Sequence, residues 1–187
     1  FVMNLDGTDI RQITKTPFSE YAAHWRKDGK KITFLSAENG SMQLWEMNDQ
    51  GSARVQISNI KGGISDYLFS PDESKIIYIA NVPYGKRTVE IYPDLPKTTG
   101  IIVDDLMYKH WDEWVTTVPH PFVADFDGKE IKNAFDLLEG TGYECPMKPF
   151  NGVEDLAWSP DGKTIAYACK KKTGLEYAIS TNTDIYL

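Results

Sequence analysis

The stretch WSPDGKTIAY at residues 158–167 decides the fold, because the chain contains it three times. The other two copies are WRKDGKKITF at residues 25–34 and FSPDESKIIY at residues 69–78. In each copy an aromatic residue closes one strand, an Asp-Gly or Asp-Glu pair sets a tight turn, and alternating hydrophobic residues begin the return strand. Each copy therefore predicts a β-hairpin.

A second phrase recurs at a related offset and predicts another hairpin turn. It occurs as NLDGTDI at residues 4–10, NDQGSARV at residues 48–55 and DFDGKEI at residues 125–131. Strand-like segments precede two of the copies, at residues 44–47 and 121–124, and one follows at residues 54–57. One repeating unit therefore holds four antiparallel strands.

The spacing of the turns locates two insertions in the middle unit. Asp28 to Asp72 is 44 residues, whereas Asp72 to Asp161 is 89. Within the first unit, Asp28 to Asp49 is 21 residues, but Asp72 to Asp127 is 55, an excess of 34. This surplus falls near residues 82–113, between the second and third strands, and another 11 residues follow the fourth strand.

Four strands in about 44 residues are typical of a propeller blade. We predict an all-β partial β-propeller, an incomplete ring of about three to four blades, forming a single domain over residues 1–187. The expected blade portions are residues 1–17 (outer strands), 18–60, 61–150 with the insertion, and 151–187 (inner strands). Open blade edges expose unpaired backbone groups, so we expect pairing with a second copy of the chain.

Composition excludes several classes of function. The 20 basic and 27 acidic residues give a net charge of −7, so we expect no nucleic-acid partner. No hydrophobic run approaches the ~18 residues of a membrane helix, and no signal-type segment opens the chain. We therefore expect a soluble piece without a membrane partner. Because the chain opens at Phe1 and stops within the strand-like residues 183–187, we expect an excised segment.

Patterns that would indicate catalysis or metal binding are missing from the sequence. No Gly-x-Ser-x-Gly nucleophile elbow is present, and the three histidines lack zinc-binding spacing. The glycines at residues 140–142 and 128 fit turns better than a dinucleotide loop or a calcium loop. We predict no catalytic residue, cofactor or metal in this chain. Cys145 and Cys169 either pair or stay free, and Cys169 ends a segment that predicts a buried strand.

The insertion holds the candidate binding residues, in the run DDLMYKHWDEW at residues 104–114. Aromatic side chains offer rigid contact area, and paired carboxylates bind an ammonium group. The candidates for substrate binding are Tyr108, His110, Trp111, Asp112 and Glu113. The alternative is a packing role, in which Trp111 and Trp114 pin the insertion onto the blade, Tyr108 packs beside them and the acidic residues face water.

The repeated Ser-Pro-Asp-Gly-Lys phrase resembles the propeller blades of prolyl oligopeptidase family serine peptidases. LMYKHWDEW at residues 106–114 resembles a segment of the dipeptidyl peptidase V and acylaminoacyl-peptidase branch. The resemblance implies a parent protein whose propeller caps a C-terminal α/β-hydrolase domain with Ser, Asp and His, and it suggests a periplasmic or extracellular location. It also implies that acidic residues of the insertion, here Asp112 and Glu113, hold the free amino terminus of a peptide.

The leading hypothesis is a non-catalytic propeller fragment of a secreted serine exopeptidase that gates and orients peptides for the hydrolase domain. The fragment alone is then expected to be inactive. The alternative hypothesis is a non-enzymatic, protein-binding propeller, because the periplasmic propeller of the Tol system carries the same blade phrase.

Overall fold

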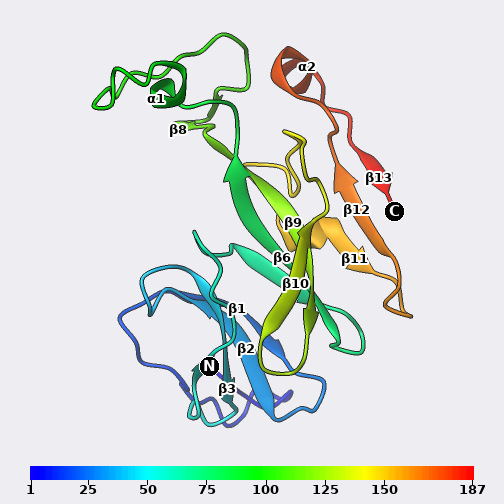
Figure 1. The fold of residues 1–187 in the computed structure, drawn as a ribbon. Coiled ribbons are helices and arrows are strands. Elements are labelled where there is room, and N and C mark those ends of the chain that lie inside the picture. The colour runs from blue at the N-terminus through cyan, green and yellow to red at the C-terminus, as the bar shows by residue number, and fades with distance from the viewer. The chain divides into compact units, whose positions relative to one another are not determined.

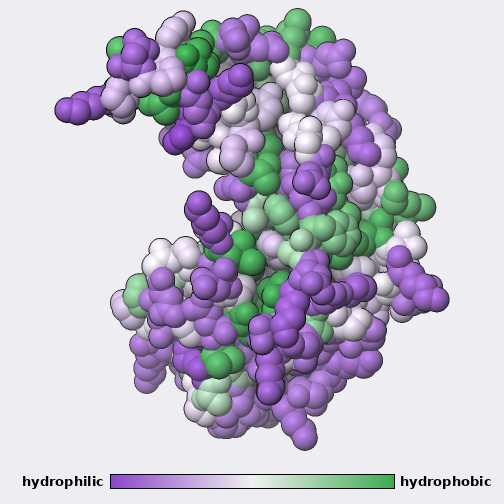
Figure 2. Space-filling view, viewed as in Figure 1, coloured by the Kyte–Doolittle hydropathy of each residue, from purple (hydrophilic) through white to green (hydrophobic).

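The computed structural model describes residues 1–187, and strands make up most of its regular structure (Figure 1). The chain forms two compact units, residues 1–78 with 124–134 and residues 79–123 with 135–187. No helix is long and hydrophobic enough to cross a bilayer. On the face seen in Figure 2, hydrophobic side chains reach the surface in several separate places.

The first sheet lies in the first unit and contains four antiparallel strands in sequential order. They are β1 (Glu20–Trp25), β2 (Lys31–Ser36), β3 (Gln43–Asn48) and β4 (Val55–Gln56). One hydrophobic cluster of this sheet is formed by Ile32, Phe34, Trp45 and Met47, and Val2 and Ile13 pack against it. The predicted four-stranded unit at residues 18–60 has this topology.

The middle sheet also has four strands, and its two central strands are long. Its strands are β5 (Asp66–Phe69), β6 (Lys75–Pro83), β9 (Thr117–Phe126) and β10 (Ile131–Asp136), in the order β10-β9-β6-β5. Backbone hydrogen bonds from Phe126 to Ser74 and from Tyr84 to Thr116 flank the antiparallel β6 and β9. The insertion between them covers residues 84–116, close to the predicted 82–113.

The insertion contains little regular structure. Helix α1 (Thr88–Ile91) is a single turn, and β7 (Lys109–His110) pairs with β8 (Glu113–Trp114) in a separate two-stranded hairpin.

The last sheet has three strands, and helix α2 lies between two of them in the sequence. The strands are β11 (Leu156–Trp158), β12 (Ile165–Cys169) and β13 (Asp184–Tyr186), in that order. A 3-10 turn, η1 (Val153–Asp155), precedes β11, and α2 (Gly174–Ile179) connects β12 to β13. The sequence did not predict α2. β13 is an edge strand, and its expected pairing with a second copy stays a prediction.

The three repeated hairpins end and turn as predicted. Trp25, Phe69 and Trp158 are the last residues of β1, β5 and β11. The residue after each turn aspartate has a positive φ: 65° at Gly29, 60° at Glu73 and 68° at Gly162. Glycine adopts this conformation without cost, whereas glutamate does not.

Glu73 compensates for this conformation by joining two successive hairpins. Its carboxylate accepts hydrogen bonds from Arg26 Nε at 2.9 Å and from the backbone N–H of Lys27 at 2.6 Å. Residues 1–17 are less regular than the predicted strand pair, with a single antiparallel bridge between Val2 and Arg11.

Candidate functional site

The β7–β8 hairpin carries four of the five candidate residues. Lys109 pairs with Trp114 and His110 with Glu113, so Trp111 and Asp112 form the two-residue loop. The backbone N–H of Val115 donates to the carbonyl of Tyr108 at 2.9 Å and closes the base of the hairpin. Trp111 has φ 54°, a conformation that a bulky residue rarely adopts.

The buried carboxylate of Glu144 holds the hairpin through His110. His110 Nε2 lies 2.7 Å from Oε1 of Glu144, whose side chain is 1% exposed. The hydroxyl of Tyr177, in α2, donates to the other carboxylate oxygen at 2.5 Å. Burial, and then the hydrogen bond with the anionic Glu144, raise the pKa of Tyr177 well above its ordinary value. Tyr177 therefore stays protonated and remains a donor to Glu144.

The insertion is anchored by a hydrophobic cluster rather than by its tryptophans. Met107, Val118 and Tyr177 are buried together. Val82, Tyr84 and Val115 pack against them. Trp114 is half-exposed, with its ring 6.1 Å from that of Tyr108 and the ammonium of Lys109 4.4 Å from its ring centre. Trp114 and Tyr108 thus pack on each other and lie outside the buried cluster.

Trp111 is 75% exposed, and its contact is with another exposed ring. The centroid of Phe150 lies 5.2 Å away with an interplanar angle of 74°. Asp112 and Glu113 are exposed as well, and their carboxylates make no hydrogen bond or ion pair. The hairpin thus presents two unpartnered carboxylates beside an exposed aromatic pair. Free carboxylates of this kind are available to bind a cation.

The five predicted residues therefore have different environments. Trp111, Asp112 and Glu113 lie at the exposed end of the hairpin, Tyr108 lies on its exposed flank, and His110 bonds to Glu144. Sequence reasoning missed Glu144 and Phe150. Glu144 belongs to the segment interpreted only as a turn, and no local pattern there signals a buried acid.

A cavity of about 790 Å³ lies beside the hairpin. Tyr108 and Trp114 line it together with residues 84–89, Ile91 and residues 98–107 of the insertion. Its lining includes aliphatic side chains and the cations Lys86 and Arg87. The chain contains no group of three or more His, Cys, Asp or Glu side chains placed to hold a metal ion.

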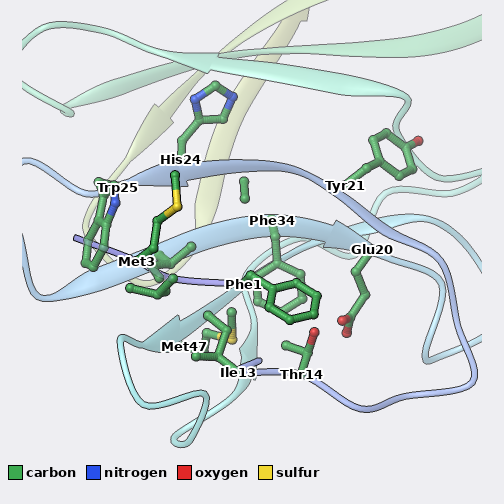
Figure 3. A pocket seen from close by; sticks show the side chains of 13 residues that line it. Phe1, Met3, Ile13, Thr14, Glu20, Tyr21, His24, Trp25, Phe34 and Met47 are labelled. Atoms are coloured by element: carbon green, nitrogen blue, oxygen red, sulfur yellow. The ribbon is translucent and has the colours of Figure 1, made fainter. Parts of the chain in front are cut away.

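A smaller cavity of about 370 Å³ lies in the first unit, between residues 1–14 and the first sheet (Figure 3). Phe1, Met3, Phe34 and Met47 are among the hydrophobic residues that line it. Its one carboxylate, Glu20, already accepts a hydrogen bond from Arg54 at 2.7 Å. The lining combines hydrophobic side chains with the polar groups of Tyr21, His24 and Trp25.

Relatives of known name match the whole chain. No family model matches it. Dipeptidyl-peptidase 5 of Porphyromonas gingivalis is 57% identical over 187 residues, which are all of this chain and 27% of that protein. Dipeptidyl-peptidase 5 of Porphyromonas endodontalis is 45% identical over 186 residues, again 27% of its length. The chain thus spans about a quarter of the length of these relatives.

Solved structures share the fold at low sequence identity. The putative TolB of Agrobacterium tumefaciens aligns over 88% of this chain and 47% of its own, with TM-score 0.50 and 23% identity. Acylaminoacyl peptidase of Pyrococcus horikoshii aligns over 89% of this chain and 22% of its own, with TM-score 0.51 and 16% identity. These neighbours confirm the open, all-β propeller-like fold class. Over its whole length the chain is thus similar to one segment of the dipeptidyl-peptidase 5 proteins, and its fold is propeller-like.

Proposed function

We propose that the chain is the propeller segment of an exported serine exopeptidase, and that its β7–β8 hairpin binds the free amino end of peptide substrates. The observation that carries the proposal is the pair of exposed, unpartnered carboxylates of Asp112 and Glu113, on a hairpin fixed by the buried Glu144. The 57% identity to a segment of a dipeptidyl-peptidase 5 supports the class of activity.

The chemistry of the hairpin suits a peptide ammonium group. Two carboxylates accept charged hydrogen bonds from the ammonium, and Trp111 with Phe150 provides contact area for the first side chains of the peptide. An amino terminus held at a fixed place sets which peptide bond reaches a nucleophile. Recognition of this kind sets how many residues are released from the amino end of the peptide.

The covalent step belongs to another part of the parent protein in this proposal. The 187 residues contain no Gly-x-Ser-x-Gly elbow, so a Ser–Asp–His triad would be supplied by an α/β-hydrolase domain. We expect the 187-residue chain alone not to hydrolyse a chromogenic dipeptide substrate. We also expect the parent protein in the periplasmic or extracellular fraction of the cell, as measured by cell fractionation and immunoblotting.

The test uses the full-length protein with Asp112→Asn and Glu113→Gln made separately. We expect kcat/KM on a free-amine dipeptidyl substrate to fall roughly 10- to 150-fold, corresponding to about 1.5–3 kcal/mol for a charged hydrogen bond. The same substrate with an acetylated amine should be unaffected. Glu139→Gln is the matched control, because Glu139 is an exposed acid outside the insertion that makes no hydrogen bond.

Equal losses on both substrates, or no loss on either, would reject amine recognition. Turnover by the purified 187-residue chain that a point substitution in it abolishes would reject the assignment of the covalent step to another domain. The full-length sequence decides between the peptidase and the protein-binding alternative. The protein-binding alternative requires that this sequence lack a nucleophile elbow followed by Asp and His.

A further inference from the structure

The two cysteines of the chain meet in the second unit. Cys145 directly follows Glu144, and Cys169 is the last residue of β12. An isolated antiparallel bridge pairs Glu144 with Lys170, so the next positions inward, Cys145 and Cys169, lie opposite each other. Both residues are 0% exposed and belong to one hydrophobic cluster with Leu138.

Both cysteines are free thiols, and each sulfur lies against the segment that carries the other cysteine. Cys145 Sγ lies 3.5 Å from the carbonyl oxygen of Ala168, and Cys169 Sγ lies 3.5 Å from that of Glu144, so each sulfur reaches the backbone of the opposite segment. The two thiols also lie close enough to perturb each other's pKa. Residues opposite each other in an antiparallel pair have Cα atoms about 4.5–5.5 Å apart, within the ~4.4–6.8 Å range of disulfides.

The two thiols differ in acidity because each acts on the other. The neighbouring thiol of Cys169, and then burial, raise the pKa of Cys145. The neighbouring thiol of Cys145 lowers the pKa of Cys169, since it stabilises the anion. Cys169 is therefore the thiol that ionises first, and the thiolate is the nucleophile in disulfide exchange.

We propose that Cys145 and Cys169 form an intramolecular disulfide when the protein meets a disulfide oxidant, either a small-molecule disulfide or the disulfide form of a thiol–disulfide oxidoreductase. The Cys169 thiolate attacks one sulfur of the oxidant, whose S–S bond breaks and releases one thiolate. Cys145 loses its proton and attacks the Cys169 sulfur of the mixed disulfide, releasing the second thiolate. The two protons of the cysteines end on the two released thiols, so two protein thiols are oxidised and one oxidant disulfide is reduced.

The bond would join the loop after β10 to the end of β12 and close the 23 residues between the two cysteines. It would hold the backbone next to Glu144, the carboxylate that supports the β7–β8 hairpin. Because both sulfurs are buried, exchange requires the chain to be unfolded or locally open. Oxidation is therefore expected to be fast during folding and slow in the folded protein.

The experiment refolds the full-length protein with oxidised glutathione as the oxidant and blocks remaining thiols with iodoacetamide in denaturant. Peptide mapping by mass spectrometry is expected to find one cross-linked peptide pair joining Cys145 to Cys169, with neither residue alkylated. The oxidised protein should melt at least about 3 °C above the same protein treated with dithiothreitol. In the double variant C145S/C169S this difference should disappear.

The mapping of the unmodified protein decides the proposal even if the serine variants fold poorly. Cys145 and Cys169 recovered in alkylated form after refolding in the oxidant would overturn it. Recovery of either cysteine joined only to glutathione or to a second copy of the chain would overturn it as well. None of these outcomes depends on peptidase activity, so failure here is distinct from failure of the proposed function.

Discussion

His110 and Glu144 are 34 positions apart in the sequence, yet His110 Nε2 lies 2.7 Å from Glu144 Oε1. Glu144 also accepts the hydroxyl of Tyr177, and the ammonium of Lys170 lies 3.8 Å from the centre of the Tyr177 ring. A single buried carboxylate thus connects the hairpin of the insertion to α2. The position of Trp111 and of the two acidic residues beside it depends on this connection.

Replacing Tyr177 with Phe tests the connection. The variant removes one donor from a buried carboxylate, so we expect the free energy of unfolding to fall by about 1.5–3 kcal/mol, measured by urea denaturation. In the full-length protein the hairpin would lose its fixed position, and under the proposed function KM for a free-amine substrate should rise more than kcat falls.

Tyr143→Phe is the matched control, because the hydroxyl of Tyr143 makes no hydrogen bond. It should cost less than about 0.5 kcal/mol. If both variants lower stability equally, the hydrogen bond of Tyr177 to Glu144 contributes nothing specific.

Substituting Trp111 tests whether this residue binds substrate or only packs against the protein. Its φ of 54° favours glycine and its side chain is 75% exposed, so Trp111→Gly should leave the free energy of unfolding unchanged within about 1 kcal/mol. The same variant should raise KM for peptide substrates, because the aromatic contact area is lost. Both quantities are measured on the full-length protein, by urea unfolding and steady-state kinetics.

Trp114→Gly provides the comparison, since Trp114 lies in β8 and packs against Tyr108 and Lys109. We expect a loss of about 1–2 kcal/mol there from the missing contacts and from glycine in a strand. A comparable loss for Trp111→Gly would mean that Trp111 is a packing residue.

The repeated hairpins could be predicted from sequence because their determinants are local. Trp25, Phe69 and Trp158 end their strands, and the turn residues follow within four positions. Turn chemistry and strand alternation both act over such distances. The spacing of these turns then located the insertion to within a few residues.

Other features depend on contacts that no local pattern carries. The bond between His110 and Glu144 and the meeting of the two cysteines arise from tertiary packing across tens of residues. Helix α2 has six residues, too few to show helical periodicity or to be stable alone. Its first residue, Gly174, lies so close to Asp105 that a Cβ atom there would meet the carboxylate at 2.1 Å. Gly174 also has φ 55°, a conformation that residues with a side chain rarely adopt, and this backbone conformation explains why glycine stands there.

Arg26 joins two carboxylates and two aromatic rings in the first unit, and its loss should be costly. Its side chain is 11% exposed and pairs with Glu46 and Glu73 at 2.8 Å each. Its guanidinium lies 5.0 Å from the ring centre of Phe69 and 4.8 Å from that of Phe126. Arg26→Ala leaves buried carboxylates without this partner, so we expect a loss of about 3 kcal/mol in the free energy of unfolding.

The control for Arg26 is Arg87→Ala, since the Arg87 side chain is 74% exposed and pairs only with Glu90. Surface pairs of this kind contribute about 0–1 kcal/mol. Denaturant unfolding of the two variants should therefore differ by at least about 2 kcal/mol. Similar losses would show that the Arg26 ion pairs are no stronger than surface pairs.

The turn aspartate of the second repeat predicts a pH dependence. The backbone N–H of Ser74, and then the hydroxyls of Ser70 and Ser74, lower the pKa of Asp72 from its ordinary 3.8 to about 2. Between these values the unfolded chain binds more protons than the folded one, so the free energy of unfolding rises with pH. The contribution of Asp72 is therefore complete above about pH 4 and is lost as the pH falls to about 2.

Asp72→Ala is expected to destabilise the protein most above pH 4, with a difference from the unmodified chain that shrinks steadily toward pH 2. Urea unfolding at intervals of half a pH unit between pH 2 and 6 measures it. Asp94→Ala, at an exposed aspartate without a hydrogen bond, should show no such trend. A constant difference across this range for Asp72→Ala would mean that the turn is stabilised by the shape of the side chain, because a hydrogen-bonded carboxylate must lose its contribution on protonation.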